Sequence, residues 1–133
     1  MAVTVAIRDQ AGSRSSAVDA IELEVPPALT MRDLIRTRVR EEVALANAAA
    51  ERGAEFRTLV QPVEAEVTLN GYRLRSRRRI DWERQAEKAE DAFRRNGFFV
   101  LVDGRQVEEL DEELSLTADS DVRFVRLTPL VGG

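Results

Sequence analysis

The side chains that usually carry protein chemistry are scarce in this sequence. It contains no cysteine and no histidine, which excludes disulfides, a thiol nucleophile and every zinc site built from those ligands. The absence of histidine also removes the commonest general base. Acidic residues crowd into 108–113, but such a run is typical of a solvated connector and not of a cleft with perturbed pKa values. We therefore expect no catalytic residue, no bound cofactor and no metal site.

Two features remain chemically distinctive. The sequence finishes on Gly132 and Gly133, preceded by Pro129, Leu130 and Val131; a chain end tolerates most residues, so the glycine pair alone also fits chance. In addition, lysine and arginine together number 20, and all but Lys88 are arginine. A GC-rich genome explains this bias. The alternative is a protein that gains from having few amine nucleophiles, because arginine stays protonated and reacts poorly.

Composition bounds the class of protein. The chain has 133 residues, 44% hydrophobic and 33% charged, which fits one globular domain. Its net charge of −4 weighs against a dedicated nucleic-acid binder. No apolar run approaches the ~20 residues that a membrane span needs, and the first ten residues lack the pattern of a signal peptide. We expect a cytoplasmic protein with no membrane partner.

The first fifty residues predict a hairpin followed by a helix. Apolar residues alternate in 3–7 and again in 21–25, with a loop at 11–16 between them; Pro26 and Pro27 end the second strand. Thr30 is a predicted N-cap for a helix over 31–52, and Gly53 is its predicted C′ residue. The apolar positions at helical spacing are Met31, Leu34, Ile35, Val39, Val43 and Ala46.

The segment 54–97 is harder to interpret. Asn70-Gly71, within 67–74, predicts a tight hairpin. A basic run from Arg73 to Arg79 follows; a solvated loop is the simplest reading, and a phosphate, RNA or acidic-partner contact is the alternative. A short helix comes next and should stop at Asn96-Gly97. Its apolar face is marked by Trp82, Ala86, Ala89 and Phe93.

The last part of the chain predicts the strongest strand, over 98–107 with a turn at Asp103-Gly104. An acidic connector with inward leucines at 110, 114 and 116 leads to a final strand at 122–127, which Pro129 ends. That strand is apolar on both faces: Val122 and Phe124 on one, Val125 and Leu127 on the other. Only one face meets a helix, so the other, either pair, is a candidate docking surface; Val125 and Leu127 are the preferred pair.

The order of elements indicates an α+β fold, with one mixed sheet packed on a helix. At this point the chain resembles the ubiquitin-like β-grasp superfamily, over residues 2–49 and 98–133. The resemblance lies in the strand and acidic connector FVLVDGRQVEELDEELSL followed by DVRFVRLTPLVGG. The Pro-x-x-Gly-Gly ending looks most like the small subunit of molybdopterin synthase, a relative of the thiazole-synthesis sulfur carrier.

The resemblance implies a function for the tail. In such families an E1-like enzyme uses ATP to adenylate the C-terminal carboxylate, which here would be that of Gly133. Glycines at 132 and 133 have no Cβ to clash in a narrow channel. Pro129 limits the conformations of the tail, and Leu130 and Val131 give the channel apolar groups to grip.

The chain departs from the family pattern at about 53–97, where compact members have no such segment. We expect a single domain over 1–133, with an inserted hairpin and second helix there and a flexible tail at 128–133. The insertion would dock a dedicated partner or cover a sheet edge.

Three functions follow from these expectations, and none makes the chain itself an enzyme. The first is a modifier joined to target proteins, with an E2-like partner and with Lys88 and the N-terminal amine as its own candidate acceptors. The second is a sulfur carrier bearing a C-terminal thiocarboxylate. The third is a non-covalent adaptor or RNA-binding domain with an inert tail.

Overall fold

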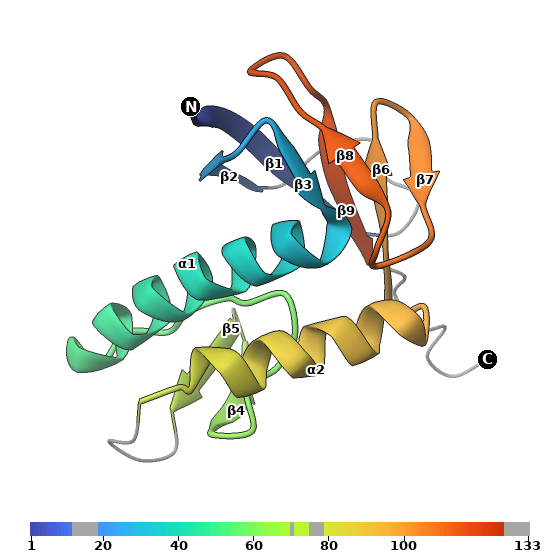
Figure 1. Cartoon of the computed structure of the whole chain (residues 1–133). Helices are drawn as coiled ribbons and strands as arrows, with labels where there is room; N and C mark the ends of the chain where they lie inside the picture. Colours follow the sequence, from blue (N-terminus) through green and yellow to red (C-terminus); the bar gives the residue numbers. More distant parts are fainter. Residues whose placement is uncertain (12–18, 70, 75–78, 127–133) are drawn as a thin grey trace. The chain divides into compact units, whose positions relative to one another are not determined.

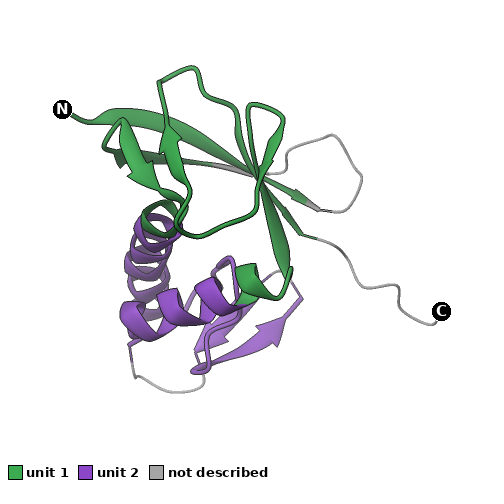
Figure 2. Ribbon diagram, turned by 45° about the vertical axis from the view of Figure 1, so that its right-hand side comes forward, with its two compact units in different colours: residues 1–34, 92–133 green, residues 35–91 purple. Residues whose placement is uncertain are grey.

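The computed structural model describes residues 1–11, 19–69, 71–74 and 79–126 and is of the α+β class. The chain divides into two compact units, one made of residues 1–34 with 92–133 and the other of residues 35–91 (Figure 2). Within the described residues, no helix is both long enough and apolar enough to cross a membrane.

The first unit holds a mixed five-stranded sheet (Figure 1). Its strands are β1 (Val3–Ala11), β2 (Asp19–Val25), β6 (Phe98–Val102), β7 (Arg105–Val107) and β9 (Val122–Arg126). Their order across the sheet is β2-β1-β9-β6-β7. The predicted N-terminal hairpin is confirmed, because β1 and β2 pair antiparallel. The last strand lies parallel to the first and in the middle of the sheet.

Strand alternation sets the core of this unit. Residues that alternate along β1, β2, β6 and β9 turn one face inward, as the sequence pattern predicts. The turn at Asp103-Gly104 is also confirmed: both residues have positive φ, 50° and 83°, as a two-residue type I′ turn requires. The buried residues of the sheet are Val5, Ile7, Leu23, Val25, Phe98, Val100, Val102, Val107, Val122 and Phe124.

A second, two-stranded sheet in this unit was not foreseen from the sequence. After Pro26 and Pro27 the chain becomes extended again as β3 (Ala28–Thr30), which pairs antiparallel with β8 (Glu113–Ser115) inside the acidic connector. Each strand has only three residues, so neither carries a readable alternation by itself. The inward direction predicted for the connector leucines is confirmed, since Leu110, Leu114 and Leu116 are buried.

Helix α1 (Met31–Glu51) begins and ends as its sequence predicts. The Thr30 hydroxyl accepts a hydrogen bond from the Asp33 amide at 3.1 Å, which caps a free N–H of the first turn. At the other end Gly53 has φ of 69°, and the Ala54 amide donates to the Ala49 carbonyl at 2.9 Å, closing a Schellman motif. All six predicted apolar positions of the helix are buried.

The second unit contains most of α1 together with residues 53–91, most of the predicted insertion. It holds a hairpin of β4 (Ala65–Thr68) and β5 (Gly71–Leu74) and most of α2 (Trp82–Arg94). The predicted hairpin is confirmed, but Gly71 is not one of its turn residues, and Asn70 lies outside the described residues. Gly71 already pairs with Thr68 as the first residue of β5.

Helix α2 stops where predicted, at Asn96-Gly97. Asn96 takes the left-handed conformation with φ of 60°, and the Gly97 amide donates to the Ala92 carbonyl at 2.7 Å. Ala86, Ala89 and Phe93 are buried as expected. Trp82 is only half-buried, and the guanidinium groups of Arg36 and Arg40 lie 5.3 and 5.5 Å from its ring centroid.

Candidate functional site around the last strand

The last strand is held on both sides. β9 bonds to β1 from Ile7↔Val122 to Ala11↔Arg126, and to β6 from Phe98↔Arg126 to Val102↔Val122. Backbone pairing therefore continues up to Arg126. The tail residues predicted to act, Leu127, Pro129, Leu130, Val131, Gly132 and Gly133, lie outside the described residues.

Aromatic packing anchors the inner face of β9. Phe124 is completely buried, and its ring lies nearly parallel to that of Phe98, with centroids 5.7 Å apart. The ring of Phe98 also packs on that of Phe93, with centroids 5.9 Å apart. Such pairs add about 0.5–1.5 kcal/mol each beyond the burial of their area. β9 is thus fixed by the side chain of Phe124 as well as by backbone bonds.

The structure decides which pair of the last strand faces inward. Val122 and Phe124 are buried, so Val125 lies on the opposite face, where it is half-buried. Val125 is paired directly with Phe99 of β6, and the neighbouring row pairs Arg123 with Leu101. Phe99 and Leu101 are half-buried as well. We call Phe99, Leu101 and Val125 the outer apolar row.

Sequence reasoning missed two of these three residues. The signal was present in the run FFVLV, which is apolar at every position and therefore apolar on both faces of its strand. Only the register reveals that Phe99 and Leu101 share a face with Val125.

A polar group borders the outer apolar row. Arg123 donates from Nε to both carboxylate oxygens of Asp121, at 3.1 and 3.2 Å, and from a terminal nitrogen to Oε1 of Gln10 at 3.4 Å. The Asp121 amide donates to Oδ1 of Asp103 at 2.9 Å. These bonds hold a guanidinium beside the apolar residues. A surface of this kind, apolar at its centre and polar at its border, suits a protein partner.

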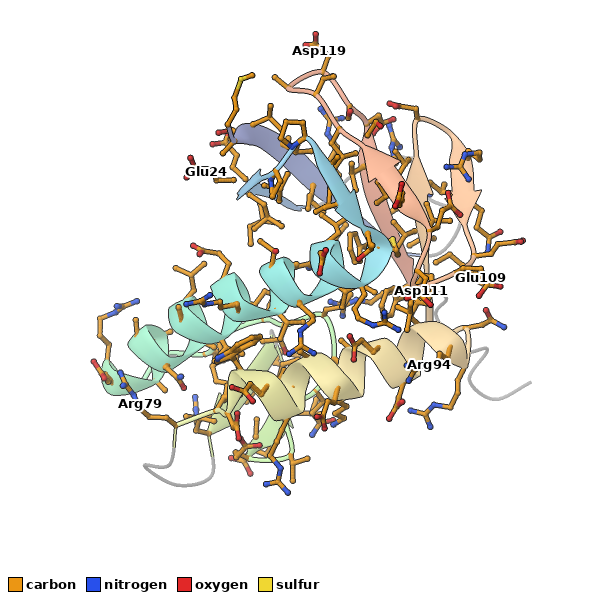
Figure 3. All side chains as sticks on the ribbon, viewed as in Figure 1. Glu24, Arg79, Arg94, Glu109, Asp111 and Asp119 are labelled. Carbon is orange, nitrogen blue, oxygen red and sulfur yellow. The ribbon has the colours of Figure 1, made fainter. Side chains whose placement is uncertain are left out.

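The acidic connector is partly neutralised by arginines of the same unit. Arg105 pairs with Glu112, and Arg32 pairs with Asp111, whose side chain is seen with that of Glu109 on the connector in Figure 3. The hydrogen bond and the attraction of Glu112 raise the pKa of Arg105 above its ordinary value. A pKa that is higher in the folded than in the unfolded state stabilises the folded protein at every pH below the pKa of the unfolded state. The contribution of Arg105 is therefore constant through the neutral range.

The remaining candidates lie in the second unit. Arg73 and Arg79 of the basic run form ion pairs with Glu55 at 3.7 Å and Glu51 at 3.0 Å, while 75–78 lie outside the described residues. Lys88, the candidate acceptor, lies on α2 and is half-buried, and its ammonium donates to the carbonyl of Gln61. Within the part of the chain that the structure describes, no cluster of three or more acidic side chains could hold a metal ion.

Comparison with known proteins gives no relative for this chain: no family model, no curated protein and no solved structure matches it.

Proposed function

We propose that this protein is a ubiquitin-like modifier of the β-grasp type, activated at the carboxylate of Gly133 by an E1-like enzyme. The carboxylate attacks the α-phosphorus of ATP, and pyrophosphate leaves. A thiol or amine then attacks the acyl carbon of the adenylate and releases AMP. The chain is the substrate of this chemistry and not its catalyst.

The observation that carries the proposal is the place of β9 in the sheet. An N-terminal hairpin, a helix and a last strand lying parallel to β1 in the middle of the sheet agree with the β-grasp resemblance. Central strands are the most firmly held parts of a sheet, so Arg126 is a fixed root. From it 133 − 126 = 7 residues lead to Gly133, with a reach of up to about 23 Å at ~3.3 Å per residue.

The composition of 127–133 suits entry into a narrow channel. Glycines at 132 and 133 place no Cβ beside the reacting carbon, and Pro129 reduces the conformational freedom that is lost on insertion. The outer apolar row, which lies on β9 and the adjacent β6, would then give the activating enzyme a surface to bind.

A sulfur carrier is the second candidate, favoured by one specific feature, the Pro-x-x-Gly-Gly ending from Pro129 to Gly133. Its activation step is the same. The adenylate is then attacked by sulfur and not by a target amine, and a C-terminal thiocarboxylate results.

Trapping the activated carboxylate tests the step that both candidates share. The protein, ATP and hydroxylamine are incubated with extract of the source cells, and the C-terminal peptide is analysed by mass spectrometry. A C-terminal hydroxamate that depends on ATP is the expected product. The variant lacking Gly132 and Gly133 should keep the thermal midpoint of the full chain and form none. An unmodified carboxylate in the full chain, with the extract shown to activate another substrate, would point to the inert-tail adaptor.

A further inference from the structure

Lys88 differs in its surroundings from a solvated surface residue. It lies on α2 within the second unit, is half-buried, and donates from its ammonium to the main-chain carbonyl of Gln61. Long basic side chains on helices more often extend into water with the charged group free. The ammonium group of the single lysine of the chain is therefore held in a hydrogen bond to the main chain.

The carbonyl that Lys88 caps belongs to half-buried Gln61, which closely follows a buried stretch without regular structure. Thr58 and Leu59 are almost fully buried, and backbone polar groups in such a place must find partners. The Leu59 amide donates to Oε2 of Glu42 at 2.7 Å, and the Val60 carbonyl accepts from Nε2 of Gln85 at 2.6 Å. The next carbonyl in the chain, that of Gln61, is satisfied by Lys88.

Gln85 and Lys88 work as a pair. They are three residues apart on α2, so they share one face of the helix, and they cap two consecutive carbonyls of the same stretch. Lys88 thus has a structural reason to be present that is independent of its reactivity.

We infer that Lys88 is a structural donor closed to acylation, and that the protein consequently offers no lysine acceptor to its own activated tail. This inference rests on the proposed function only in its second part. To be acylated, the amine must lose a proton, leave the Gln61 carbonyl and attack an acyl carbon, from which the leaving group departs. Every other basic side chain is an arginine, which stays protonated and is a poor nucleophile. Conjugated copies would then be linked to one another only through the N-terminal amine and never through a lysine.

Acylation rates measure the first part without any activating enzyme. The folded protein is treated with limiting N-hydroxysuccinimidyl acetate, and acetylation is followed by peptide mass spectrometry. The matched control is Arg84→Lys, which places an amine on the exposed surface of the same helix. Because its amine must first leave the Gln61 carbonyl, Lys88 should react at least about tenfold more slowly than the introduced amine. In urea, where the protein is unfolded, Lys88 and the introduced amine should be acetylated at the same rate. A smaller ratio in the folded protein overturns the inference.

The conjugates test the second part. The two proteins are compared for branched peptides that join the tail of one copy to a lysine of another. Arg84→Lys should yield self-linked copies through the introduced amine, and the unmodified protein should yield none through Lys88. A branch on Lys88 would overturn the inference. If neither protein forms a conjugate with anything, the proposed modifier function fails, and the acylation ratio still decides whether Lys88 is closed.

Discussion

Replacing Gly71 by alanine should destabilise the second unit, for a steric reason that can be read from the backbone. A Cβ built on Gly71 would lie 2.3 Å from the carbonyl oxygen and 3.1 Å from the carbonyl carbon of Phe56. Both are main-chain atoms, so no side chain can rotate away. The same carbonyl accepts from the Tyr72 amide at 2.7 Å, and the Phe56 amide donates back to Tyr72 at 2.9 Å.

The cost follows from the two ways of relieving this clash. Separating Phe56 from Tyr72 loses two backbone hydrogen bonds, about 1 kcal/mol each. Keeping them forces the surrounding residues to shift, which typically costs about 1–3 kcal/mol. By either route, Gly71→Ala should lower the free energy of unfolding by about 1–3 kcal/mol. With a urea slope of about 2 kcal/mol per molar, the unfolding midpoint should fall by about 1 M.

Gly53→Ala is the control for this experiment. A Cβ at Gly53 meets nothing within 4 Å, so its only cost is the left-handed backbone, about 1–2 kcal/mol. Hydrogen exchange at the Phe56 and Tyr72 amides separates the two variants, since only Gly71→Ala should lose protection there. An unfolding free energy for Gly71→Ala within about 0.5 kcal/mol of the unmodified protein would refute the steric reasoning.

Three further substitutions test other parts of the account. Glu42→Gln should cost about 3–5 kcal/mol in urea unfolding, because it removes the carboxylate that pairs with the buried Arg38; a cost below about 1 kcal/mol would show that this pair is dispensable. Phe124→Ala should cost about 3–5 kcal/mol by the same assay, and a smaller loss would contradict tight anchoring of β9. Phe99→Ser should lower the free energy of unfolding by about 1–2 kcal/mol, because Phe99 is half-buried, and should slow ATP-dependent hydroxamate formation about tenfold at a temperature where the variant is folded. Thr4→Ser, on the same sheet face, should not slow it; equal rates would exclude the outer apolar row from recognition.

Much of the first unit, and both ends of α1, could be predicted from the sequence because their signals are local. Alternation in β1 and β2, the Thr30 cap, the Gly53 terminus and the Asp103-Gly104 turn each depend on residues within one element or one turn. The structure confirms all of them. Whether the whole is a β-grasp fold remains part of the proposal.

The features that escaped prediction depend on pairing between distant segments. β3 and β8 are extended only because they bond to each other, with Leu29 opposite Leu114. The placement of Gly71 is explained by Phe56, fifteen positions earlier, and not by the turn itself. Likewise, nothing around Lys88 in the sequence indicates that its amine reaches Gln61.

The central claim is tested most directly by the tryptic peptides of the source cells. Cleavage after Arg126 leaves residues 127–133, LTPLVGG, attached to any lysine that the tail has modified. The account predicts lysine peptides of other proteins that carry this remnant as a branch through Gly133. A C-terminal peptide heavier by about 16 Da, in which sulfur replaces oxygen, with no branched peptide in any sample, would contradict the modifier and establish the sulfur carrier in its place.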